Sequence, residues 1–286
     1  MDVGVYTFAT DLDMEPQRFA TEAEDREFCA LMLPEHSHIP VGRTTPYPLA
    51  YGGGVLPDFY KRTYDPFVAL SFMAAATSRI RLGTGICLLA LRDPIHTAKM
   101  VASVDALSGG RFVFGVGFGW NADEFLNHSE SFEKRHSVVR EKVELMKELW
   151  TKDVASYEGV HVRLDPSWCW PKPVQAPHPP VYLGGNGPVT MRQAACWADG
   201  WYPTGPLGDP FLDRSIPEFR QMASDAGRDP ASLRIGIAPA SVDEEALLAL
   251  EANGVDECNV AVMGTDDTHL LANLDALARC RDRAFG

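Results

Sequence analysis

The sequence contains no long apolar run and no block of basic residues. No stretch reaches the roughly 18 apolar residues that a membrane-spanning helix needs, and no charged-then-apolar leader follows Met1. We therefore expect a cytoplasmic protein that does not insert into membranes. The formal net charge of −13 leaves no Lys/Arg-rich surface to neutralise a phosphate backbone, which argues against a nucleic-acid-binding protein.

Cysteine patterns typical of metal sites and redox centres are missing as well. The six cysteines include no CxxC pair and no close Cys/His cluster. A cytosolic chain of this size needs no disulfides, so we interpret the cysteines as mostly buried small apolar residues and expect no metal or redox role for them. They are Cys29, Cys87, Cys169, Cys196, Cys258 and Cys280.

The chain does have the length and the apolar content for a large core. Its 286 residues are 45% hydrophobic and 10% aromatic, which suits one α/β barrel as well as two smaller domains. Apolar runs alternate with helix-forming segments, and strands buried on both faces read as such continuous runs. The candidate strands are 2–8, 28–33, 79–89, 111–117, 181–185, 200–204, 233–238 and 257–263.

This alternation predicts the fold class and the domain organisation. Eight strands alternating with helices are typical of a (β/α)8 TIM barrel, here a single domain over 1–286, and a doubly wound open sheet is the alternative. The proline-rich segment 157–180 is interpreted as an irregular insertion before the fifth strand. The irregular segment 41–61 is long enough to be a lid or a binding loop. Substrate identity is expected to depend on these two segments.

Glycines gather at the ends of two neighbouring candidate strands, within 79–120. Bulky side chains would pack such strands better, so the glycines suggest a flat ligand that approaches the backbone closely. They are Gly83, Gly85, Gly115, Gly117 and Gly119.

Four motifs, in this order along the chain, identify the sequence with a known family. They are PEHSHIP at 34–40, RLGTGICLLALRDPIHTAK at 81–99, ALSGGRFVFGVGFGW at 106–120 and WPKPVQAPHPPVYLGGNGP at 170–188. Together they resemble the luciferase-like monooxygenase superfamily, specifically its F420-dependent oxidoreductase branch. The resemblance implies a barrel that binds F420, acts on a small-molecule substrate and forms a homodimer.

The resemblance also implies an irregular backbone conformation at the end of the third strand. In F420-dependent members, a bulge with a non-prolyl cis peptide lies behind the middle ring of the deazaflavin. The matching residues are Thr84, Gly85 and Ile86, and the matching bond is Gly85–Ile86. The alternative is an ordinary strand end with glycine for packing.

Two further strand ends are candidates for cofactor contact. Gly117, Gly119 and Asn121 can reach the edge of a flavin-like ring, although Asn121 also suits a helix N-cap. The other strand end, after the candidate strand 181–185, precedes a helix and is expected to bind phosphate. Arg192 would offset the negative charge of the phosphate. The alternative is a tight turn without a ligand. Its residues are Gly184, Gly185, Asn186 and Gly187.

His36 follows the second strand and is the candidate catalytic residue, with Glu35 to orient or tune it. Hydride transfer to or from a carbinol needs a group that takes or gives the hydroxyl proton, and imidazole titrates in the useful range. The alternative is that His36 only contacts the cofactor. A zinc-hydrolase site built on His36 and His38 lacks partners for the remaining ligand positions.

The sequence therefore predicts an F420-dependent oxidoreductase that transfers a hydride between C5 of the deazaflavin and a small organic substrate. Two alternatives remain open: an FMN-dependent monooxygenase that uses reduced flavin and O2, and a non-catalytic flavin-binding barrel.

Overall fold

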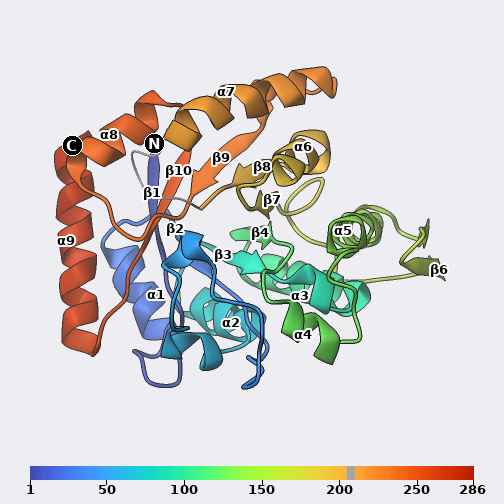
Figure 1. Cartoon of the computed structure of the whole chain (residues 1–286), viewed down its shortest axis with the longest axis horizontal. Helices are drawn as coiled ribbons and strands as arrows, with labels where there is room; N and C mark the ends of the chain where they lie inside the picture. The colour runs from blue at the N-terminus through green and yellow to red at the C-terminus, as the bar shows by residue number, and fades with distance from the viewer. Residues whose placement is uncertain (205–209) are drawn as a thin grey trace.

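The computed structural model describes residues 1–204 and 210–286 and folds as a closed barrel of parallel strands (Figure 1). The spatial order is β1-β10-β9-β8-β7-β4-β3-β2, and β1 closes the barrel by pairing with both β10 and β2. The eight strands predicted from the sequence are confirmed. They are β1 (Asp2–Tyr6), β2 (Ala30–Leu33), β3 (Arg81–Cys87), β4 (Phe112–Val116), β7 (Val181–Gly184), β8 (Gly200–Tyr202), β9 (Arg234–Ile237) and β10 (Glu257–Ala261).

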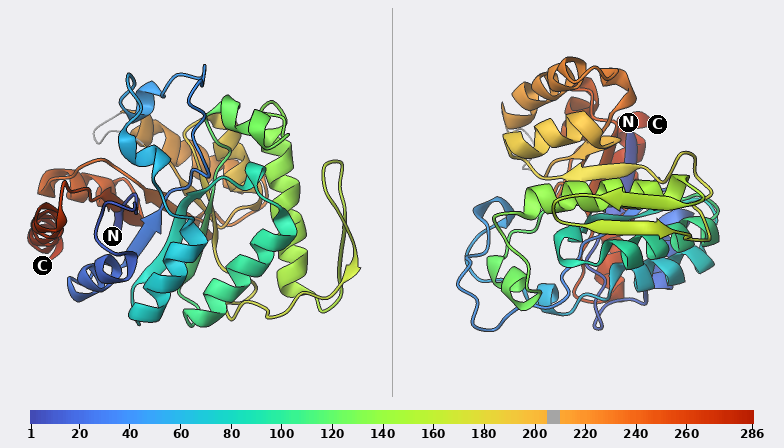
Figure 2. Two further views of the ribbon diagram at one scale, coloured as in Figure 1. Left: turned by 90° about the horizontal axis from the view of Figure 1, so that it is seen from below. Right: turned by 90° about the vertical axis from the view of Figure 1, so that its right-hand side faces the viewer.

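Helices surround the barrel and separate its strands along the chain (Figure 2). Aspartate caps the start of α2, α3, α8 and α9 by accepting backbone N–H groups of the first turn, and proline opens α2 and α3. None of the helices within the described ranges is long and apolar enough to cross a membrane. The helices are α1 (Pro16–Asp25), α2 (Pro66–Ala76), α3 (Pro94–Leu107), α4 (Ala122–Asn127), α5 (Arg135–Thr151), α6 (Pro188–Trp197), α7 (Pro210–Asp225), α8 (Glu244–Ala252) and α9 (Asp267–Phe285).

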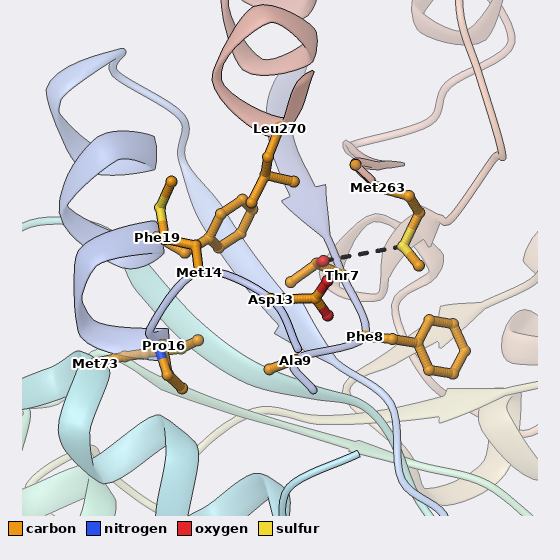
Figure 3. Close-up of a pocket in the computed structure, with 11 residues that line it drawn as sticks. Thr7, Phe8, Ala9, Asp13, Met14, Pro16, Phe19, Met73, Met263 and Leu270 are labelled. Carbon is orange, nitrogen blue, oxygen red and sulfur yellow. Dashed lines mark hydrogen bonds between the residues drawn. The ribbon is translucent and has the colours of Figure 1, made fainter. Parts of the chain in front are cut away.

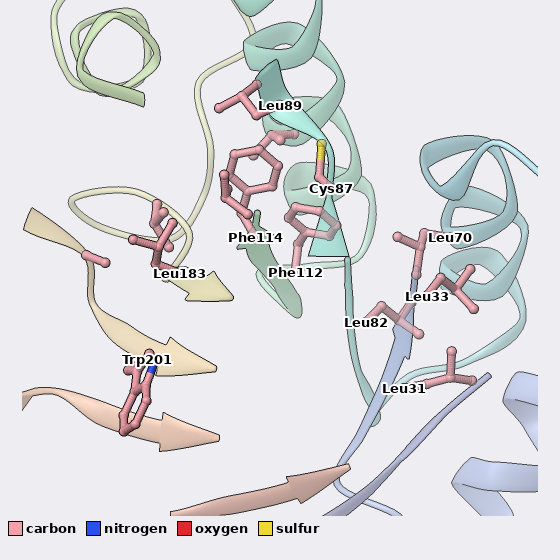
Figure 4. Close-up of a cluster of buried hydrophobic side chains, with 14 of the residues drawn as sticks. Leu31, Leu33, Leu70, Leu82, Cys87, Leu89, Phe112, Phe114, Leu183 and Trp201 are labelled. Carbon is pink, nitrogen blue, oxygen red and sulfur yellow. The ribbon is translucent and has the colours of Figure 1, made fainter. Parts of the chain in front are cut away.

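The main hydrophobic core lies between the strands and the helices around them (Figure 4). A second, smaller cluster of Met32, Val113, Tyr182 and Tyr202 is buried as well. Glycine lies beside the tyrosine rings of this cluster: a Cβ on Gly200 would lie 2.8 Å from the Tyr182 ring. The barrel is therefore a packed core rather than a pore, which leaves its end as the place for a ligand.

The insertion between α5 and the fifth barrel strand is an antiparallel hairpin of β5 (Ala155–Glu158) and β6 (Arg163–Ser167), which projects from the side of the barrel (Figure 2). The chain then passes the N-terminal end of β4, where Gln175 Nε2 donates to the Phe112 carbonyl at 2.7 Å. In a parallel barrel this end is opposite the carboxyl ends of the strands. The expectation that all of 157–180 bears on substrate identity is therefore wrong for the part around Gln175.

Candidate active site

The carboxyl ends of the strands meet at one end of the barrel. Tyr6 ends β1, and a Cβ built on Gly85 of β3 would lie 3.5 Å from its ring. Gly117 follows β4 and donates its backbone N–H to the Cys87 carbonyl of β3 at 2.9 Å. The structure thus brings together residues of β1, β3 and β4 that the sequence keeps far apart.

The end of β3 has the backbone that the family resemblance implies. The Gly85–Ile86 peptide is cis, and the register with β4 shifts between Thr84 and Cys87. The fully buried Thr84 donates its hydroxyl to the Gly115 carbonyl at 2.6 Å. Its side chain is therefore used to hold β3 against β4 at the bulge.

The Ile86 side chain occupies the space beside several strand-end glycines. A Cβ on Gly117 would lie 1.5 Å from Ile86 Cδ1, and a Cβ on Gly184 would lie 2.8 Å from Ile86 Cγ2. Any side chain at these positions would overlap Ile86. The interpretation that the strand-end glycines make room for a flat ligand is thus corrected at Gly117, where the glycine first makes room for Ile86. Gly184, which was predicted to belong to a phosphate-binding turn, makes room for the same side chain.

Asn121 is buried at the start of α4, and its side-chain amide lacks a hydrogen-bond partner in the part of the chain that the structure describes. Its exposed fraction is 1%. Neither Oδ1 nor Nδ2 has a hydrogen-bond partner among the described residues, and the side chain makes no cap bond to α4. Gly119 lets the chain turn here, since its φ is +75° and a Cβ would lie 2.9 Å from the Phe125 ring. The N-cap alternative for the Asn121 side chain is not observed.

His36 pairs with a carboxylate from another part of the chain. Its Nδ1 lies 3.0 and 3.1 Å from the two carboxylate oxygens of Glu124 in α4. The His36 side chain is 6% exposed and that of Glu124 is 1% exposed. Thr63 Oγ1 donates to the His36 carbonyl at 3.2 Å, which fixes the backbone as well. Glu124 therefore holds the ring, and Thr63 holds the backbone that carries it.

Glu35, the predicted partner of His36, is bound elsewhere. Its carboxylate accepts the Leu88 backbone N–H at 2.8 Å and Arg92 Nε at 2.5 Å. Arg92 also pairs with Asp65 at 2.5 Å. The carboxylate of Glu35 thus ties the end of β2 to the chain after β3, and Glu124 is the acid in contact with the imidazole.

Aromatic side chains of segment 41–61 and of the β4 end surround His36. The ring centroids of Tyr60 and Trp120 lie 5.1 and 5.8 Å from that of His36. The Tyr47 and Tyr60 hydroxyls are 3.2 Å apart, and burial raises the pKa of Tyr60. These contacts support the prediction that segment 41–61 belongs to the site.

The glycine-rich turn between β7 and α6 is partly bound within the protein. The Asn186 side chain accepts the Thr204 backbone N–H at 2.8 Å and donates to the Thr204 carbonyl. Gly185 N–H donates to the Tyr202 carbonyl at 3.2 Å. A Cβ on Gly187 would meet nothing within 4 Å. Pro188 opens α6 without an N–H, and Met191 N–H donates to the Gly187 carbonyl at 3.1 Å, so the backbone donors at this helix start are those of Val189 and Thr190. Arg192 is exposed one turn further on.

A small cavity lies apart from the candidate site around His36 and Asn121. This cavity of about 20 Å³ between Thr7 and Met263 has room for little more than one water molecule (Figure 3). No group of three or more His, Cys, Asp and Glu side chains within 1–204 and 210–286 is arranged to hold a metal ion.

His36 and the strand-end residues were predicted from the sequence, whereas Glu124 and Tyr60 beside His36, and Tyr6 beside Gly85, were not. Glu124 follows the glycine motif of β4 closely, which was a usable signal, because strand-end loops of a barrel converge. Nothing in the local pattern around Tyr6 or Tyr60 distinguishes them from packing aromatics.

Comparison with known proteins was consistent with this geometry. The family model described as luciferase-like monooxygenase matches residues 14–257. An uncharacterized protein of Mycobacterium tuberculosis is 41% identical over 230 residues, which cover 80% of this chain and 80% of that protein. The F420-dependent glucose-6-phosphate dehydrogenase of Gordonia bronchialis is 32% identical over 198 residues, which cover 66% of this chain and 58% of that protein.

Solved structures share the fold at low sequence identity. A monooxygenase from Streptomyces bottropensis has a TM-score of 0.81 at 19% identity, with 100% of both chains covered. An F420-dependent secondary alcohol dehydrogenase in complex with an F420-acetone adduct has a TM-score of 0.77 at 16% identity, with 100% of this chain and 99% of that chain covered. At these identities the likeness shows the fold alone.

Proposed function

The chain belongs to the luciferase-like monooxygenase family and is a luciferase-like oxidoreductase, and we propose that its cofactor is F420. In this proposal a hydride passes between the deazaflavin and a small organic substrate held beside His36. The similarity to an F420-dependent dehydrogenase at 32% identity supports F420 over FMN. The alternative is an FMN-dependent monooxygenase, and the relative affinities for F420 and FMN distinguish the two.

The unpartnered amide of Asn121 carries the proposal. Both of its polar atoms are buried without a partner in the described chain, and leaving such groups unsatisfied costs about 1–3 kcal/mol. The pyrimidine part of a flavin-like ring presents donors and acceptors that an amide can meet. We assign the ring to Asn121 together with Gly85, Ile86, Gly117 and Gly119, which lie at the same end of the barrel.

The phosphate-bearing part of the cofactor is assigned to the turn before α6. Free N–H groups at a helix start favour anions, and the open space at Gly187 allows close approach. Gly184 and Gly185 complete this turn. Asn186 acts by fixing the turn through its two bonds to Thr204, rather than by direct contact.

The chain itself supplies the proton chemistry around the substrate. When bound, F420 supplies two-electron hydride chemistry. His36 would take or give the hydroxyl proton of the substrate, as imidazole can near neutral pH. Tyr60 and Trp120 pack on its ring and keep bulk water from it. Glu35 contributes by holding the backbone that carries His36.

Titration of the purified protein with F420 and with FMN, followed by fluorescence, tests the proposal. We expect F420 to bind at least about tenfold more tightly, which corresponds to about 1.4 kcal/mol. Tighter binding of FMN would overturn the assignment and favour the monooxygenase. Tight F420 binding without turnover on any hydride donor or acceptor would favour a non-catalytic flavin-binding barrel.

A further inference from the structure

We propose that Glu124 is a positioning residue that fixes the tautomer of His36, so that Nε2 is the atom that exchanges a proton with the substrate. This inference rests on the proposed function, in which His36 is the acid/base group. It assigns to Glu124 the role that the sequence suggested for Glu35.

The geometry between the two side chains determines which ring nitrogen carries hydrogen. Both oxygens of Glu124 lie within hydrogen-bond distance of His36 Nδ1, at 3.0 and 3.1 Å. An ionised carboxylate can only accept, so Nδ1 must donate. A neutral imidazole has a single N–H, and Nε2 is therefore left with a free lone pair.

The burial of Glu124 stabilises its pairing with His36 Nδ1. Its side chain is 1% exposed, and its carboxylate has no other hydrogen-bond partner among the described residues. A buried carboxylate that lost its partner would pay a large desolvation cost, so rotation of the imidazole away from Glu124 is disfavoured. Glu124 and the ring thus hold each other in place.

The other neighbours of His36 leave Nε2 available. Glu35 is bound to Leu88 N–H and to Arg92, and it cannot compete for the ring. Tyr60 and Trp120 contact the ring through edge-type packing rather than hydrogen bonds. No described residue is hydrogen-bonded to Nε2. The orientation of the ring therefore points its acceptor atom away from Glu124.

An Nε2 acceptor suits the couple of an alcohol and a carbonyl compound. In the proposed oxidation of a carbinol, bound F420 would supply the acceptor for the C–H hydrogen and its two electrons. The hydroxyl proton of the carbinol passes to Nε2, and the C–O bond becomes double. The imidazolium formed in this way faces the carboxylate of Glu124, which stabilises the positive charge. Carbonyl reduction follows the same path in reverse.

Nitrogen-15 NMR of the imidazole rings in the cofactor-free protein tests the inference, with His36 assigned by the signal lost in His36→Ala. We expect wild-type His36 to be in the Nδ1–H tautomer at a pH where the ring is neutral. Glu124→Gln should give a mixture of tautomers, since an amide can accept from or donate to Nδ1. The matched control Glu35→Gln, at the neighbouring buried carboxylate, should leave the tautomer unchanged.

A wild-type Nε2–H tautomer would overturn the inference, and so would a Glu124→Gln spectrum identical to that of the wild type. The wild-type spectrum decides the question even where the variant does not fold. The F420 affinity of Glu124→Gln is expected to equal that of the wild type, which separates positioning of His36 from cofactor contact. Weak F420 binding by the wild type with the expected tautomer would contradict the proposed function and leave the His36–Glu124 pairing intact.

Discussion

Asn121 places amide donors and a carbonyl acceptor where no described residue bonds to them. Replacement by leucine removes these groups at similar volume. We predict that Asn121→Leu leaves the cofactor-free protein as stable as the wild type, or up to about 1 kcal/mol more stable, because an unsatisfied amide no longer has to be buried. F420 should bind at least about tenfold more weakly. Thermal unfolding and fluorescence titration measure the two effects.

A second buried asparagine provides the control for this substitution. Asn259 Nδ2 donates to the Tyr202 hydroxyl at 3.1 Å and to Glu257 at 2.8 Å. Asn259→Leu should therefore destabilise the protein by about 1–3 kcal/mol, because it breaks bonds that the fold uses. If Asn121→Leu caused a similar loss with unchanged F420 affinity, Asn121 would be a structural residue.

His36 and its partner Glu124 come from distant parts of the chain. The position of His36 after the second strand indicated an acid/base candidate, because its chemistry is local to one side chain. Its partner was assigned to the adjacent Glu35, whereas the structure pairs it with Glu124, 88 positions further along the chain. Choosing between two carboxylates requires knowing where each side chain is directed, and that depends on long-range packing.

The element that follows β4 joins several parts of the site within five residues. Trp120 packs on His36, Asn121 is buried at the start of α4, and Glu124 holds the imidazole. Asp123 accepts the Thr45 N–H at 2.9 Å and the Thr45 hydroxyl at 2.7 Å, with a further bond from Thr44 N–H. The carboxylate of Asp123 therefore links the start of α4 to segment 41–61.

We predict that Asp123→Ala loosens segment 41–61 from α4. Trypsin should then cleave after Arg43 about fivefold faster, because the segment opens locally more often. Hydrogen bonds from Thr45 hold the pKa of Asp123 below its ordinary value of 3.8, so the tether is complete above that pH and is lost as the pH falls through the lowered value.

Limited proteolysis followed by mass spectrometry measures the cleavage rate in this variant. Glu133→Ala is the control, since the bond that the Glu133 carboxylate accepts from Ser131 is local and does not involve segment 41–61. Equal rates of cleavage after Arg43 in the Asp123 and Glu133 variants would show that Asp123 does not hold the segment.

For the glycines at the ends of β3 and β4, the sequence indicated a close neighbour, and the strand register decides which residue it is. The sequence indicated that something lies close to Gly117, and the family resemblance placed a bulge at Gly85–Ile86. That the close neighbour is the Ile86 side chain follows only from the register shift between β3 and β4. A one-residue change in register reverses which side chains face a neighbouring strand.

At the scale of the whole molecule, Glu24 joins the first and third strand-helix units of the barrel. The carboxylate of this α1 residue accepts backbone N–H groups of Ser78, Arg79 and Ile80, at 3.0, 2.6 and 2.8 Å. Burial on its own would raise the pKa of Glu24, but the backbone hydrogen bonds outweigh it and hold the pKa below 4.5. This contribution to stability is complete above the unfolded-state pKa and is lost as the pH falls through the lower folded-state value.

We predict that Glu24→Gln lowers the free energy of unfolding by about 1–3 kcal/mol at neutral pH, since the amide replaces an acceptor by a donor facing N–H groups. The difference from the wild type should shrink as the pH falls below 4.5. Urea denaturation at several pH values measures it. Glu15→Gln, at an exposed residue before α1 without a cap bond, should change little. A difference that grew toward acid pH would contradict the assignment.

The sequence by itself determined the barrel, the family and the strand ends that form the candidate site. Alternating apolar runs and helix signals are local patterns, and a closed parallel barrel is the arrangement that buries every one of them. Only the tertiary structure decided that Glu124 pairs with His36, that Ile86 fills the space at Gly117 and that Gln175 lies at the far end of the barrel. These contacts join residues far apart in sequence, and they depend on strand register and on side-chain direction, which local periodicity does not specify.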